Sequence, residues 1–233
     1  MACAAPRAGA AMSQIFAVFQ KDLFIERRAA SRTVALVGFA GILLLILSFA
    51  IGADSRALQQ HAAAYIWIGV LLCSTMLLER SFRLEVEAGA LHSLILGPVR
   101  PSALFYGKAL ANTVQLIALA IVTIPLVIVF CDASFDGDAH VLWLTLVLGA
   151  AGLSAPGTLY AAMIARMQGK QLMLPLLLFP LVVPVLVAAV KATSLAMLGD
   201  PMDQAGGWLT LLGCFNLVFW SLSGVLFGRV LET

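Results

Sequence analysis

The chain has 233 residues, of which 62% are hydrophobic and 11% are charged, and its formal net charge is +2. Soluble domains carry roughly 25% charged residues, so this composition excludes a water-soluble globular protein. The net charge is too small to suggest a nucleic-acid partner, and the basic residues do not form one long run.

The N-terminal segment is too polar for a secretory signal peptide, because the first long apolar run begins only at Val34. Residues 1–13 are expected to be a disordered extension. Residues 14–32 are patterned instead: apolar and basic side chains fall in separate sectors of a helix. The helix is expected to lie in the cytoplasmic interface of the membrane, and the alternative is a basic stretch that only fixes topology. Its defining residues are Phe16, Phe19, Lys21, Leu23 and Arg28.

Six apolar runs follow, and each is long enough to cross about 30 Å of hydrocarbon as a helix, or nearly so. They lie at about 34–52, 62–78, 109–131, 141–165, 172–190 and 208–228. None contains Asp, Glu, Lys or Arg, so a proton-coupled transporter is not expected, because such transporters use ionisable groups in the bilayer. We predict an all-α integral membrane protein in which residues 14–231 form a single transmembrane domain.

The basic residues predict the orientation. A cytoplasmic N-terminus puts twelve of the 14 Lys and Arg residues inside and leaves only Arg56 and Lys191 outside. This distribution obeys the positive-inside rule. Because six is an even number of spans, both termini are predicted to be cytoplasmic.

The longest predicted cytoplasmic connection runs from Glu79 to Lys108. Glu79 and Arg83, and likewise Arg83 and Glu87, are opposite charges four residues apart, which supports a helix that continues the second span into the cytoplasm. A short apolar helix at 91–96 is predicted to follow. Such a helix has to be buried, either on the lipid or in a groove of a soluble partner.

The fifth span contains Pro175, Pro180 and Pro184, each of which removes a backbone donor and favours a kink. The stretch after it, from Lys191 to Gly207, is too long for a tight turn. It is expected to be either an ordinary loop or a partly inserted segment on the outer side.

Two candidate sites in the spans have simpler interpretations. The segment 152–155, Gly-Leu-Ser-Ala, is similar to a rhomboid nucleophile segment, but no histidine follows residue 140 to act as its base, so small residues that allow close helix packing are the preferred interpretation. His61 and His140 are at predicted outer ends of spans. We interpret them as solvated or capping residues, with haem ligation as the alternative.

Several runs resemble one known family. The segments 78–82, Leu-Glu-Arg-Ser-Phe, and 107–112, Gly-Lys-Ala-Leu-Ala-Asn, resemble the CcmB family, the membrane subunit of the haem exporter system for cytochrome c maturation. Lys21-Asp22-Leu23 with Glu26 resembles the interfacial helix of that family. The resemblance covers about residues 14–231, with a departure at Asn216, where relatives often carry Asp.

The resemblance implies an exporter permease of the ABC-2 type in the bacterial inner membrane. Its implied partners are a CcmA-type ATPase, CcmC-type and CcmD-type membrane subunits and a CcmE-type haem chaperone. Haem is implied as a transported or handled ligand, with no cofactor bound directly. A homodimer is expected by analogy. The alternatives are a permease for another substrate, such as a lipid-linked sugar or a drug, and a membrane scaffold that transports nothing.

The chain lacks the Gly-x-x-x-x-Gly-Lys-Ser/Thr sequence of a nucleotide-binding loop, so it is expected to be non-catalytic, with ATP hydrolysed in a partner. The apolar helix in the longest connection is then predicted to be the coupling helix that seats on the ATPase. The residues assigned to this contact are Arg80, Arg83, Glu85, Glu87, Leu91, Leu94 and Ile95.

Overall fold

The structure is a computed structural model that describes residues 8–28, 30–52, 54–87, 100–133, 137–165 and 173–232. The regular elements within these ranges are all α-helices. They are α1 (Ala8–Arg28), α2 (Ala30–Ile51), α3 (Ser55–Glu87), α5 (Pro101–Cys131), α6 (Ala139–Ala165), α7 (Met173–Leu198) and α8 (Ala205–Glu232). Every one except α1 contains a segment long and apolar enough to span a membrane. The predicted all-α integral membrane fold with six spans is therefore confirmed.

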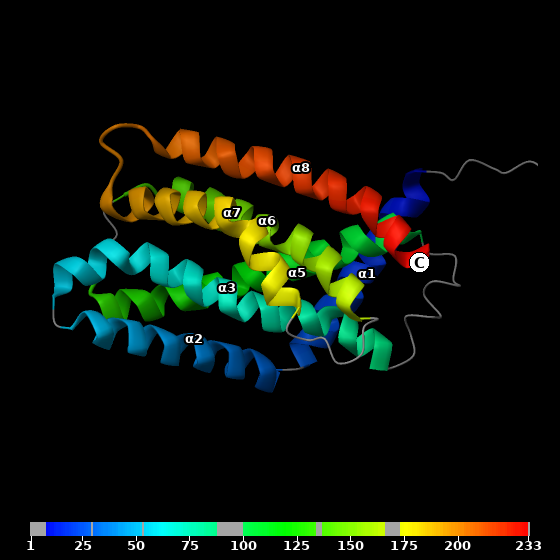
Figure 1. The fold of residues 1–233 in the computed structure, drawn as a ribbon, viewed down its shortest axis with the longest axis horizontal. Helices are drawn as coiled ribbons and strands as arrows, with labels where there is room; N and C mark the ends of the chain where they lie inside the picture. Colours follow the sequence, from blue (N-terminus) through cyan, green and yellow to red (C-terminus); the bar gives the residue numbers. More distant parts are fainter. Residues whose placement is uncertain are drawn as a thin grey trace, which may run out of the picture.

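The six long helices run side by side, with α2 and α8 on opposite flanks (Figure 1). Helix α1 crosses the long axis of this bundle at one end, and α8 ends at that same end. We call this the α1 end. The short connections from α2 to α3, from α5 to α6 and from α7 to α8 lie at the other end, which we call the opposite end.

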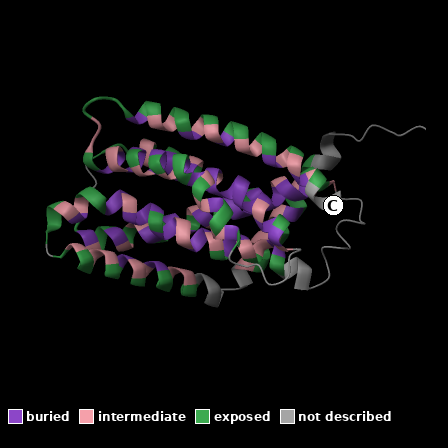
Figure 2. Cartoon of the chain, viewed as in Figure 1, coloured by how far each residue is buried: buried purple, intermediate pink, exposed green. Residues whose placement is uncertain are grey.

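Burial is concentrated in the middle of the bundle (Figure 2). In α6, 67% of the spanning window is buried inside the protein, whereas in α2 the share is only 11%. Helix α6 can be enclosed because its glycines let neighbours approach: a Cβ at Gly149 would overlap the ring of Trp67, and one at Gly157 would overlap Leu78. In the same helix, the Ser154 hydroxyl donates to the Ala109 carbonyl of α5 at 2.6 Å. These small residues therefore serve helix packing.

Helix ends differ from expectation in three places. Residues 8–13, which the sequence assigned to a disordered extension, form the start of α1. Helix α7 continues past Lys191 to Leu198, so the described connection to α8 is only Gly199–Gln204 and the partly inserted segment is not formed. Helix α5 begins at Pro101, a residue suited to a first helical turn, which places Lys108 inside a helix rather than in a loop.

A buried charge junction as candidate functional site

Helix α3 is much longer than a bilayer requires. Its 33 residues correspond to about 50 Å at 1.5 Å per residue, against about 30 Å of hydrocarbon. At the α1 end it carries Glu79 and Arg83, whose side chains form an ion pair at 3.8 Å. The predicted continuation of the second span is therefore confirmed, and it presents Arg80 and Arg83 as exposed residues.

Lys108 of α5 is the most unusual polar residue in the described part of the chain, because its side chain is only 1% exposed. Its Nζ donates to the Ser81 carbonyl of α3 at 2.8 Å and forms an ion pair with Asp22 Oδ2 of α1 at 3.1 Å. The same ammonium lies 4.7 Å from the ring centroid of Phe82. One side chain thus joins α1, α3 and α5.

The second residue of the junction, Asp22, links a buried charge to an exposed one. Its Oδ2 faces Lys108, and its Oδ1 lies 3.3 Å from the ammonium of Lys21, whose side chain is 42% exposed. A buried ion pair contributes little net stability, because desolvation offsets much of the attraction. Its geometry is nevertheless specific, so the pair fixes where α1 sits along α5.

Helix α1 can reach this position because residue 107 is a glycine. A Cβ at Gly107 would lie 2.7 Å from Val18 Cβ and 2.9 Å from the Ile15 carbonyl oxygen, so any side chain there would push α1 away. The backbone N–H of Arg100 also donates to Gln14 Oε1 at 3.4 Å, near the start of α5. Helix α1 is therefore held against α5 between Gln14 and Val18 and at the charge junction.

Three aromatic side chains, one each from α3, α5 and α8, pack together beside the junction. The rings of Phe82 and Phe105 lie 6.0 Å and 5.4 Å from the ring of Phe227, with tilted planes that suit aromatic packing. All three are at most 1% exposed. The last helix is thus packed onto the same end of α3 and α5.

The predicted coupling residues are only partly within the described structure. Leu91, Leu94 and Ile95 lie outside the described residues. Glu85 and Glu87 belong to the last turn of α3, and their side chains also lie outside the described part. Of the assigned set, Arg80 and Arg83 are the members whose side chains can be placed.

The residues assigned to an interfacial helix all fall within α1. Phe16 is 57% exposed and stacks on the half-buried Phe19 with ring centroids 6.4 Å apart. Leu23 is half-buried, and Lys21 is exposed. Arg28 is the last residue of the helix, and its side chain lies outside the described part.

The two histidines are far from the charge junction. His61 lies near the start of α3 and His140 near the start of α6, both at the opposite end of the bundle and both exposed. Within the described ranges, no three residues of the types His, Cys, Asp and Glu are grouped so that they could hold a metal ion.

Sequence reasoning missed the role of Lys108, Asp22 and Gly107. A lysine directly before an apolar run was assigned to a cytoplasmic loop, because hydropathy treats each run separately and does not report a partner 86 residues away. A signal was present, since all three residues lie in the runs that resemble the CcmB family.

The known proteins that are similar to this chain belong to one family. The sequence model of the family described as CcmB protein matches residues 13–232. Heme exporter protein B of Rhodobacter capsulatus is 32% identical over 73% of the chain and 78% of its own length. The protein of the same name from Pseudomonas aeruginosa is 30% identical over 88% of the chain and 92% of its length, and that of Escherichia coli K12 is 28% identical over 84% and 87%.

Proposed function

Because the chain belongs to the CcmB protein family, we propose that it is the membrane subunit through which a separate ATPase drives the handling of haem for cytochrome c biogenesis. The ATP-driven step is either export of haem or release of a haem-loaded chaperone outside the membrane. Haem is the transported or handled ligand in this proposal, and not a resident cofactor.

The observation that carries the proposal is the junction at Lys108. It joins α1 and the extension of α3 to α5, about two turns before α3 ends and about two turns after α5 begins. Packed helices transmit displacement because protein interiors are dense and deform little. A partner that pushes on this connection would therefore move α1, α3 and α5 together.

The remaining parts of the proposal concern orientation and assembly. The α1 end faces the cytoplasm, in agreement with the basic residues assigned there by the positive-inside rule. The ATPase, of the CcmA type, docks at this end in the bacterial inner membrane. Helix α1 lies in the interface, with Phe16 toward the lipid. A homodimer would present one connection to each of two ATPase subunits, and membrane subunits of the CcmC and CcmD types with a CcmE-type chaperone complete the system.

Charge reversal tests the coupling contact. The double variant Glu85→Lys/Glu87→Lys should insert normally but lose most of the co-purifying ATPase and of the cytochrome c yield, because two acidic contacts at the end of α3 become basic. The control is Asp138→Lys, which reverses an exposed acid at the opposite end. Unchanged ATPase binding and activity in the first variant would contradict the proposal.

The same two measurements, ATPase co-purification and cytochrome c yield, separate the alternatives. If the wild-type chain binds an ATPase but deletion of this chain leaves the cytochrome c yield unchanged, a permease for another substrate is supported. If no ATPase accompanies the wild-type chain in mild detergent, the scaffold is supported instead.

A further inference from the structure

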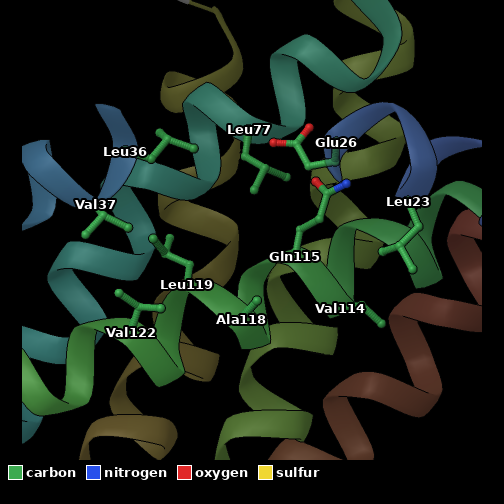
Figure 3. A pocket seen from close by; sticks show the side chains of 10 residues that line it. All are labelled: Leu23, Glu26, Leu36, Val37, Leu77, Val114, Gln115, Ala118, Leu119 and Val122. Carbon is green, nitrogen blue, oxygen red and sulfur yellow. The ribbon is translucent and has the colours of Figure 1, made fainter. Parts of the chain in front are cut away.

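A pocket of about 340 Å³ opens between α1, α2, α3 and α5 near the α1 end (Figure 3). Eight of its ten lining residues are apolar, and the two polar ones are Glu26 of α1 and Gln115 of α5. In Figure 3 these two side chains lie next to each other at one end of the pocket. The pocket therefore has a polar end and an apolar body.

The shape of the pocket suits a chain molecule that lies along the membrane normal. Its α5 wall runs from Val114 to Val122, a rise of eight residues or about 12 Å of helix. Val114 and Val122, at the two ends of the α5 wall, are 39% and 41% exposed, so the pocket opens at the side of the bundle. In a membrane this side faces lipid acyl chains.

Glu26 gives the pocket its chemical preference. Its side chain is half-buried, and no hydrogen bond or ion pair joins its carboxylate to another part of the described chain. A carboxylate beside an apolar wall is favoured by a cation close to it and disfavoured by an anion. Haem is a poor fit, because its propionates are anionic and the described lining offers no His, Cys, Met or Tyr as an axial ligand.

We propose that this pocket binds one acyl chain of a phospholipid with a primary-amine headgroup, whose ammonium group pairs with Glu26. Gln115 supplies an amide N–H donor for an ester or phosphate oxygen of the same lipid. The lipid fills the space between α1, α2 and α5. It thereby supports α2, the least buried of the six spans. The site is additional to the ATPase coupling proposed above.

The headgroup preference can be measured on the purified full-length protein. Delipidated samples are titrated with phosphatidylethanolamine or with phosphatidylglycerol of the same acyl chains, and bound lipid is counted by native mass spectrometry. The wild-type chain should prefer the amine lipid by roughly two- to fivefold, the range of a partly exposed ion pair. Glu26→Gln should reduce this ratio to about one. A wild-type ratio of one, or a ratio unchanged in Glu26→Gln, overturns the proposal.

Occupancy of the apolar body is tested by filling it. Ala118→Phe places a ring in the pocket and should remove the tightest-bound lipid, whereas the control Ala50→Phe, on an exposed position of α2 outside the pocket, should not. Ala118→Leu serves the same test if the larger variant does not purify as a single species. Lipid retained in both pocket variants contradicts the proposal.

Two further measurements, disulfide trapping and ATPase co-purification, distinguish the lipid site from a protein contact and from the ATPase coupling. A disulfide from Val122→Cys to a cysteine of a second copy or of another subunit, formed when an oxidant is added to native membranes, would show that protein occupies the pocket, and the lipid assignment would fail. Co-purification of the ATPase should be unchanged in Glu26→Gln. Loss of the lipid preference with normal ATPase binding supports the lipid site, and the reverse pattern contradicts it.

Discussion

Lys108 Nζ lies 3.1 Å from Asp22 Oδ2, although the two residues are 86 positions apart in the sequence. The pair fixes the position of α1 on α5 and brings α3 into the same contact through the Ser81 carbonyl. The first two predictions concern this junction.

Neutralising the pair should reveal its coupling energy. Asp22→Asn and Lys108→Met should each lower the free energy of unfolding, and the double variant should be less destabilised than the sum, because each single change leaves the other charge in a poorly solvated place. The interaction energy should be about 1–3 kcal/mol. Unfolding in mixed detergent micelles of the wild type and the three variants gives this value. Strict additivity would mean that the pair contributes no specific interaction.

Adding one methyl group at residue 107 should displace α1. Gly107→Ala places a Cβ within 2.7 Å of Val18 Cβ and within 2.9 Å of a backbone oxygen, so neither neighbour can give way cheaply. Protease cleavage within α1 should become faster, and Val18→Ala should restore protection only in part. Gly213→Ala is the control, since nothing lies within 4 Å of that position. Equal protease resistance of Gly107→Ala and wild type would contradict the described packing of α1 against α5 at residue 107.

The hydrogen bond between Trp67 and Thr193 should stabilise the half of the bundle that lies away from the charge junction. The indole Nε1–H donates to Thr193 Oγ1 at 2.9 Å, and both residues are fully buried between α3 and α7. Thr193→Val keeps the shape but leaves a buried donor without an acceptor, which should cost about 1–2 kcal/mol of unfolding free energy. Thr193→Ser retains the hydroxyl and should be clearly milder. Identical losses in the two variants would indicate that packing, and not the hydrogen bond, is responsible.

Asp200 should make the connection between α7 and α8 sensitive to acid. Its Oδ2 accepts the backbone N–H of Ala205 at 2.7 Å and its Oδ1 accepts that of Gln204 at 2.9 Å. These hydrogen bonds lower the pKa of Asp200 below its usual value of 3.8. A lowered pKa means that the stabilisation is complete above the pKa of the unfolded chain and is lost as the pH falls through the lower value in the folded state.

Hydrogen exchange at the amides of Gln204 and Ala205 measures this effect. After correction for intrinsic rates, protection should be constant above about pH 5 and should fall below about pH 4. Asp200→Asn should remove the pH dependence, whereas the control Asp203→Asn in the same connection should retain it. Constant protection of the wild type down to about pH 2 would contradict the role assigned to the carboxylate.

The sequence alone determined the number of spans and the extension of α3. Both depend on local properties, because a run of about 20 apolar residues has to satisfy its backbone within one helix, and charges four residues apart meet on the same helix face. The same local reasoning placed the end of α7 too early. Hydropathy falls at Lys191, but a lysine near the end of a span can extend its charge toward the interface while the helix continues.

Only the tertiary structure decided what the polar residues near the α1 end do. The environment of Lys108 depends on Asp22, Ser81 and Phe82, and the need for glycine at residue 107 depends on Val18. Likewise, the pocket at Glu26 exists only because four helices leave space beside it. None of these relationships is periodic along the chain, since each arises from contact between helices that are distant in sequence. The sequence therefore identified a membrane bundle, and the packing of α1, α3 and α5 determined where its charges are buried.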